Sequence, residues 1–196
     1  MRYPAEHKAS TREKIVNAAA QSFRERGSQG GGIASMMKDL GLTHGGFYRH
    51  FGSKEDLYVQ AVTRAFQQAG DRMVEAAKRA PKGGELRAII ESYLSLGHLE
   101  HVGQGCAVAA LAPEIARQPP AVRSKVNAAF KAHMNRLLPF VPGENASEKR
   151  RNFFILFPAM AGVLMMARTI TEPARRKEIL AAARRFYTEA FAERRS

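Results

Sequence analysis

The chain has 196 residues, of which 45% are hydrophobic and 25% are charged, the balance of a protein that buries a core. This composition excludes a disordered tail, a collagen-like fibre and a disulfide-stapled miniprotein, because a single cysteine cannot form an internal disulfide. The net charge of +13 favours nucleic acid or another polyanion as a partner. Residues 1–56 carry only nine Lys and Arg against six Asp and Glu, so charge alone does not identify the binding segment.

No segment of the sequence is expected to cross a membrane. Residues 1–8 lack the apolar region of a signal peptide. The longest apolar run, residues 153–167, has 15 residues and includes Pro158, whereas a bilayer span needs about 20. We therefore expect this run to be a buried helix, and the protein to be cytoplasmic without a membrane partner.

Apolar residues recur with the 3.6-residue period of helices between Gly and Pro breaks, and no sustained period-2 pattern of a strand occurs. The first helix is expected over residues 11–26, with a capping box from Ser10 to Glu13 and Gly27 as its stop. Later helices are expected over residues 33–40, 43–51, 53–78, 85–100, 106–117, 120–138, 147–168 and 173–193. The sequence thus predicts an all-α fold of about nine helices, with a three-helix head in residues 1–56 and a helical body in residues 57–196.

Residues 33–51 contain two short helices that can be stable only when they pack on each other and on the first helix. Gly41 stands where the turn between them requires a left-handed residue, and Thr43 can cap the second helix. The apolar residues available for packing are Ile33, Met36, Met37, Leu40, Leu42, Phe47 and Phe51. This pattern is typical of a helix-turn-helix, whose second helix enters the major groove of DNA.

The second of these helices contains two glycines, Gly45 and Gly46, which each cost about 1 kcal/mol relative to alanine in a helix interior. A helix with a purely structural role would avoid them, whereas a bare backbone can approach DNA closely. Hydrogen-bond donors surround the pair, namely His44, Tyr48, Arg49, His50 and Lys54. The alternative, a helical hairpin with a polar surface, does not account for this coincidence, and DNA binding is favoured.

Residues 41–57, GLTHGGFYRHFGSKEDL, resemble the signature of the TetR family of bacterial transcriptional regulators, and the first helix resembles the family as well. The resemblance covers residues 10–57. It implies a homodimeric repressor with a helix-turn-helix head that binds a double-stranded DNA operator and a body that dimerises and binds an inducer.

The resemblance also implies roles for individual residues. His44, Gly45 and Gly46 would face base edges. Tyr48, His50 and Lys54 would hold phosphates, and Arg49 would serve either role. The family usually has Thr at the position of Gly32 and a basic or polar residue at that of Ala34, so Ser35 and Lys38 are expected to contribute instead. The expected DNA-binding residues are Ser35, Lys38, Thr43, His44, Gly45, Gly46, Tyr48, Arg49, His50 and Lys54.

The run of residues 153–167 is apolar on every side, as in a helix that is buried all round. In a body of this size we expect a partner subunit to cover its outer side, with the last two helices of each chain forming a four-helix interface. A core helix inside a monomer is the alternative.

An inducer pocket is expected among the middle helices, where Met and Phe side chains suit an adaptable apolar ligand surface. The inducer is an unknown small molecule. The candidate ligand or sensor residues are His98, Leu99, Cys106, Phe130, Met134, Phe157 and Met160.

The alternative from a different class of protein is a small helical enzyme or metal-binding protein, whose site would use His98, His101 and Cys106. The two histidines share a helix face, but no fourth ligand with telling spacing accompanies them, and no acid or oxyanion motif accompanies the cysteine. We therefore expect no catalytic residue, no metal site and no cofactor. A nonspecific DNA-architectural protein is a third alternative, which the large apolar body disfavours.

Cys106 has two competing interpretations. Gly103 and Gly105 break the chain before an alanine-rich run, which places Cys106 in or near the first turn of a helix, where the dipole favours a thiolate. His98 and His101 would add positive charge there if protonated, and the Gly105-Cys106 pair resembles a TetR subgroup with electrophile-responsive members. The opposing interpretation is a small, inert, buried side chain.

Overall fold

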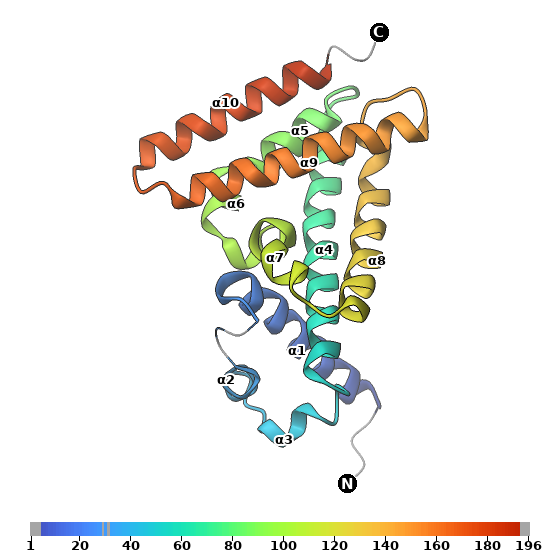
Figure 1. The fold of residues 1–196 in the computed structure, drawn as a ribbon, viewed down its shortest axis with the longest axis vertical. Coiled ribbons are helices and arrows are strands. Elements are labelled where there is room, and N and C mark those ends of the chain that lie inside the picture. The colour runs from blue at the N-terminus through green and yellow to red at the C-terminus, as the bar shows by residue number, and fades with distance from the viewer. Residues whose placement is uncertain (1–4, 29, 31, 193–196) are drawn as a thin grey trace.

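The computed structural model describes residues 5–28, 30 and 32–192 as an elongated all-α molecule (Figure 1). Within these residues the chain forms ten α-helices and two 3-10 helices and contains no strand. The head consists of α1 (Ala5–Arg26), α2 (Ile33–Asp39) and α3 (His44–Phe47), and α4 (Lys54–Arg79) leads from it into the body. The body contains α5 (Glu85–Tyr93), α6 (Leu96–Glu100), η1 (Val102–Gln104), α7 (Ala107–Ala116), α8 (Pro120–Leu137), η2 (Leu138–Phe140), α9 (Ala146–Thr169) and α10 (Pro173–Ala192).

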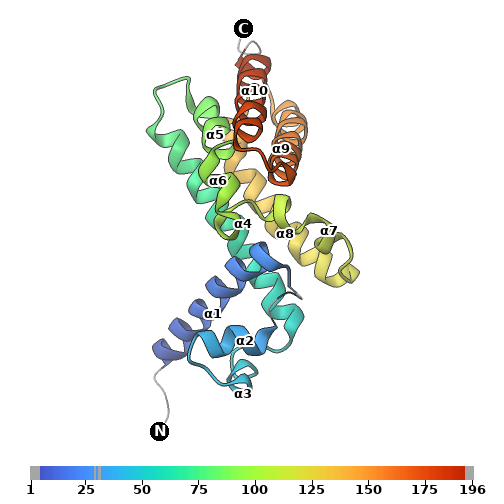
Figure 2. The same cartoon turned by 90° about the vertical axis from the view of Figure 1, so that its left-hand side faces the viewer.

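Helix α4 connects the two ends of the molecule. It begins at Lys54 because the side chain of Ser53 accepts a hydrogen bond from the backbone N–H of Asp56, as the sequence predicts for an N-cap. Its apolar face is buried along its whole length. Figures 1 and 2 show α1–α3 at one end of this helix and α9 and α10 side by side at the other.

Two apolar cores lie along α4. The first joins α1, α2 and α3 to the first half of α4 and continues into α7 and α8 through Leu111 and Val122. The second lies between α4, α5 and α9, with Ile89, Leu156 and Met160 fully buried. Helix α4 crosses the predicted boundary between residues 56 and 57, and the head shares its core with the body. The predicted division at that boundary stays a prediction.

Three predicted helix boundaries are wrong. Helix α1 already includes Ala5, so Ser10 lies inside it and is not its N-cap, because residues 5–9 contain no Gly or Pro to prevent helix. Helix α3 ends at Phe47 and not at residue 51, since the chain turns there before the cap of α4. The helix expected over residues 85–100 is broken at Leu94, because Ser95 caps a new helix by accepting from the N–H of His98.

Helix α9 is long and apolar enough, by length and composition, to cross a membrane. One side of it is buried against the rest of the body, where Leu156, Met160 and Leu164 are fully covered. The core helix of a soluble protein passes the same test of length and composition. The other side is exposed in the single chain.

Candidate nucleic-acid interface and body cavity

The turn between α2 and α3 has the conformation that its sequence predicts. Gly41 has a φ of +68°, the left-handed region that glycine adopts without a steric penalty. The hydroxyl of Thr43 accepts a hydrogen bond from the N–H of Gly46 at 3.2 Å and caps α3. Met37 and Phe47, one from each helix, are buried in the shared core. These contacts fix α3 at the end of the molecule farthest from α9 and α10 (Figure 1).

The candidate contact residues lie on the outside of this pair of helices. The Tyr48 ring is 61% exposed, and its edge packs against the ring of Phe47. A Cβ atom at Gly45 would meet no heavy atom within 4 Å, so the backbone there is bare. The side chain of His44 is outside the described part of the structure. Also exposed are Ser35, Lys38, Thr43, Arg49 and Lys54, while Gly46 and His50 are half-buried.

His50 is harder to protonate than an ordinary histidine. Burial, with the positive charges of Lys8, Arg12 and Arg49, lowers its pKa below the ordinary value for histidine. A neutral imidazole can still donate one hydrogen bond to a phosphate. Arg12, which the sequence analysis missed, holds this segment: its Nε donates to the His50 carbonyl at 3.2 Å, and its guanidinium stacks 5.0 Å from the Phe51 ring centre.

Two hydrogen bonds tie the head to the ends of α7. The buried Arg24 of α1 donates to the carbonyl of Gly105 at 3.0 Å, just before α7 begins. Near the other end of α7, the carboxylate of Glu114 accepts from the N–H of Ser28 at 3.0 Å, just after α1 ends. A displacement of α7 therefore acts on α1 at two points.

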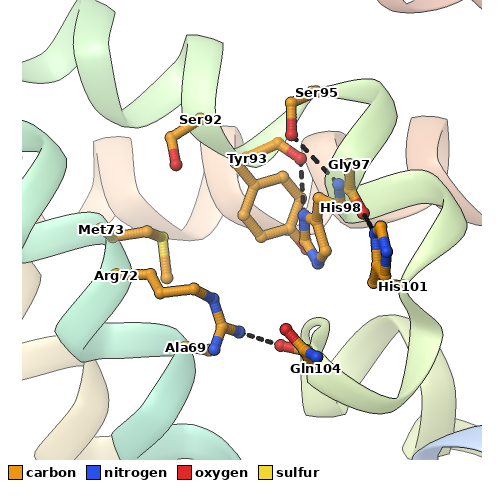
Figure 3. A pocket seen from close by; sticks show the side chains of 10 residues that line it. All are labelled: Ala69, Arg72, Met73, Ser92, Tyr93, Ser95, Gly97, His98, His101 and Gln104. Atoms are coloured by element: carbon orange, nitrogen blue, oxygen red, sulfur yellow. Dashed lines mark hydrogen bonds between the residues drawn. The ribbon is translucent and has the colours of Figure 1, made fainter.

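A cavity of about 220 Å³ opens to solvent beside the first of these links (Figure 3). Arg72 reaches it from α4, and His101 lies on the other side, just after α6, with Gln104 between them. The Arg72 guanidinium donates to the Gln104 carbonyl. The lining residues are Ala69, Arg72, Met73, Ser92, Tyr93, Ser95, Gly97, His98, His101 and Gln104, none of which is acidic.

His98 is held in one neutral form by its hydrogen bonds. Its Nδ1 lies 2.6 Å from the Tyr93 carbonyl, which can only accept, so Nδ1 carries the proton. Its Nε2 accepts from the backbone N–H of Cys106 at 2.8 Å. Burial, with the charges of Arg168, Arg72 and Arg24, lowers the pKa of His98 to about 4. The protonated form of His98 beside Cys106 is therefore disfavoured, and a sensor role for Cys106 stays a prediction.

The positive charge around Cys106 comes instead from Arg24, Arg72 and Arg168, which lie close enough to interact with it electrostatically. The thiol itself is buried, and Cys106 is the N-cap residue of α7. Sequence analysis missed the arginines because they belong to three separate helices. Within the described residues, His98, His101 and Cys106 form no group that could hold a metal ion.

The apolar ligand candidates lie elsewhere. Leu99, Met134, Phe157 and Met160 are buried in the body core, and Phe130 packs against it. None of these five lines the cavity beside Arg72; of the seven candidates, only His98 does.

Comparison with known proteins adds matches over most of the chain. Residues 15–61 match the family described as bacterial regulatory proteins, tetR family, and residues 84–183 match the tetracyclin repressor-like C-terminal domain. The transcriptional regulator LmrA of Bacillus subtilis is 26% identical over 123 residues, which cover 62% of this chain and 65% of LmrA. The transcriptional repressor BepR of Brucella suis is 35% identical over 78 residues, 40% of this chain and 37% of BepR. The chain thus spans about two thirds or less of the curated relatives it matches.

A solved structure shows the same fold over the whole molecule. A TetR-family transcriptional regulator from Agrobacterium tumefaciens superposes with a TM-score of 0.73 at 23% identity, covering 94% of this chain and 98% of that one.

Proposed function

Since this chain is a transcriptional regulator of the TetR family, we propose that it is a repressor that binds a palindromic operator as a homodimer and releases it when an inducer binds the body. The observation that carries the proposal is the surface of α2 and α3, where exposed donors surround the bare backbone of Gly45. The name of BepR, a repressor, supports the sign of regulation. A cytoplasmic location follows from a DNA partner.

We assign the residues of this surface to phosphates or to bases according to their chemistry. Lys54 and Arg49 are exposed cations that suit phosphate oxygens, and phosphate contacts position a protein without reading sequence. Gly45 allows the backbone to reach the groove, and base reading is assigned to His44 with its neighbours. Few side chains remain to read bases, so we expect most of the affinity to depend on salt.

The homodimer proposal rests on an exposed apolar stripe on α9. Phe154 and Ile155 are each 53% exposed in the single chain, and Met166 is 59% exposed. Phe186, on the neighbouring α10, is 64% exposed. An apolar surface of this kind is rare on a monomer and typical of a subunit interface. We propose that α9 and α10 of two chains cover each other, as the sequence predicts.

Release of the operator requires the body to act on the head, and the links from α7 to Arg24 and Ser28 offer a route. We propose that an inducer in the body shifts α7 and so moves α1 and the DNA-binding surface. A small molecule is the proposed inducer. The alternative inducer is an electrophile that reacts with Cys106, and Cys106→Ser distinguishes the two: it abolishes a response to an electrophile and preserves a response to a noncovalent ligand.

Selection of duplexes from a random library by the purified protein tests the proposal. We expect an inverted repeat whose half-site centres are about 10 bp, or a multiple of that, apart, because two recognition helices are related by a two-fold axis. Enrichment of sequences without such symmetry would contradict the homodimeric operator complex.

A further inference from the structure

Arg72 lines the cavity, and Arg24 and Arg168 lie close enough to act on His98 in its wall. The carboxylates of Glu25 and Asp71 act on Arg24 and Arg72 electrostatically, but neither forms an ion pair with these arginines. Arg24, Arg72 and Arg168 form no ion pair in the described part of the chain. They donate to neutral acceptors instead, chiefly the carbonyls of residues 98, 99, 104 and 105. Asp71, the acidic group nearest Arg72 along the chain, already pairs with Arg136.

This charge acts on the cavity itself. Burial, together with the neighbouring charge of Arg72, lowers the pKa of Arg24 to about 10. All three guanidiniums disfavour protonation of His98, which lines the cavity wall. Uncompensated cations that are partly removed from water are costly, and a bound anion would remove that cost.

The cavity wall combines these charges with an apolar side. Arg72 is itself exposed to solvent on the cavity side, and its guanidinium can form two parallel hydrogen bonds with a carboxylate. His101 and Gln104 are exposed at the rim. Ala69, Met73 and Tyr93 are buried behind them and offer an apolar surface to the body of a ligand.

We propose that this cavity binds a small organic anion, a carboxylate with an apolar body, through Arg72, His101 and Gln104. Its use as the inducer site rests on the proposed function, but binding itself does not. Gln104 lines the site and precedes Gly105, whose carbonyl Arg24 of α1 contacts, so an occupant lies one residue from a link between body and head.

Calorimetric titration of the DNA-free protein at constant ionic strength tests the site. The probes are benzoate and hexanoate, the uncharged benzamide and hexanamide, and inorganic phosphate. We expect at least one carboxylate to bind about tenfold to a hundredfold more tightly than its amide, the range of a charged hydrogen bond. Carboxylates that bind no better than their amides, or no better than phosphate, overturn the proposal.

Two variants locate the binding. Arg72→Gln and Gln104→Glu should each weaken carboxylate binding about tenfold or more, the first by removing the donor and the second by adding a negative charge at an exposed rim position. Arg79→Gln is the matched control, because it removes the same charge from an exposed position on the same helix. Equal losses in Arg79→Gln and Arg72→Gln would show attraction by net charge alone and overturn the site.

A failure of carboxylate binding can be distinguished from a failure of the proposed operator binding, because two different experiments measure them. Operator affinity is measured by fluorescence anisotropy without any carboxylate, so a failure of operator binding appears there alone. A failure of carboxylate binding appears in calorimetry alone.

Discussion

At the scale of single residues, the half-buried His98 and the buried His133 make stability depend on pH. The pKa of His98 and that of His133 are each lowered to about 4, chiefly by burial. In the unfolded chain a histidine titrates near 6.5, so between the two values the unfolded state binds more protons. Stability from these groups is complete above pH 6.5 and is lost as the pH falls towards 4.

We therefore expect the free energy of unfolding to fall by about 1–2 kcal/mol per histidine between pH 7 and pH 5. Urea denaturation of wild type and of His133→Gln at both values measures this, and the variant should lose less than wild type. His101→Gln, at an exposed position, is the control. An equal pH dependence in all three proteins would show that burial of His133 does not favour its neutral form.

The positions of single residues also explain why the cavity could not be predicted from the sequence. Gly41, Thr43 and Ser53 act through neighbours a few residues away, so their roles were predictable. Arg24, Arg72 and Arg168 come together only when α1, α4 and α9 pack, and no local pattern marks them. Most of the ligand candidates that the sequence offers are apolar, and Leu99, Met134, Phe157 and Met160 lie in the core, whereas His98 alone of the candidates lines the cavity.

At the scale of elements, α3 is a helix whose stability is limited by its glycines. Gly45 has no neighbour within 4 Å of a Cβ atom, so alanine fits there. We expect Gly45→Ala to raise the free energy of unfolding by about 0.5–1 kcal/mol, because alanine favours helix. It should also weaken operator binding, since the added methyl group occupies the face that approaches DNA.

The matched control is Gly97→Ala, which changes an exposed helical glycine in α6. Because Gly97 also lines the cavity beside Arg72, operator affinity is compared without a carboxylate, and Gly97→Ala should leave it unchanged. Thermal denaturation and anisotropy titration measure the two effects, and an unchanged operator affinity in Gly45→Ala would remove this backbone from the DNA interface.

Several element boundaries lie where the sequence has a cap or a breaker, although the capping box at Ser10 does not begin α1. Gly27, with a φ of +74°, ends α1, and α8 begins at Pro120 as expected. The break at Leu94 was missed because Ser95 caps α6 in the middle of an otherwise helical pattern. The early start of α1 was missed because its residues 5–9 carry no apolar stripe that would show a helix.

At the scale of the whole molecule, the exposed stripe on α9 makes a prediction about assembly. Gly162 lies on this helix, and a Cβ atom there meets nothing within 4 Å in the single chain. Gly162→Arg should therefore fold as a monomer, while in a dimer the added charge would be buried without a partner at a cost of several kcal/mol.

Sedimentation equilibrium measures the effect: wild type should be a dimer and Gly162→Arg a monomer with unchanged helicity. Ala121→Arg adds the same charge at an exposed position on α8 and should remain a dimer. A dimeric Gly162→Arg would exclude this face of α9 from the interface.

The central claim is that the end of the molecule formed by α2, α3 and the start of α4 binds DNA. Lys54 and Lys78 are exposed lysines at opposite ends of α4, one at this surface and one far from it. Anisotropy titrations of the selected duplex over a range of salt concentrations should give a plot of log affinity against log salt. The slope should be shallower by about 2 for the Lys54→Ala dimer, one phosphate contact per subunit, and unchanged for Lys78→Ala. Equal slopes for wild type and Lys54→Ala, or a loss in Lys78→Ala alone, would contradict the claim.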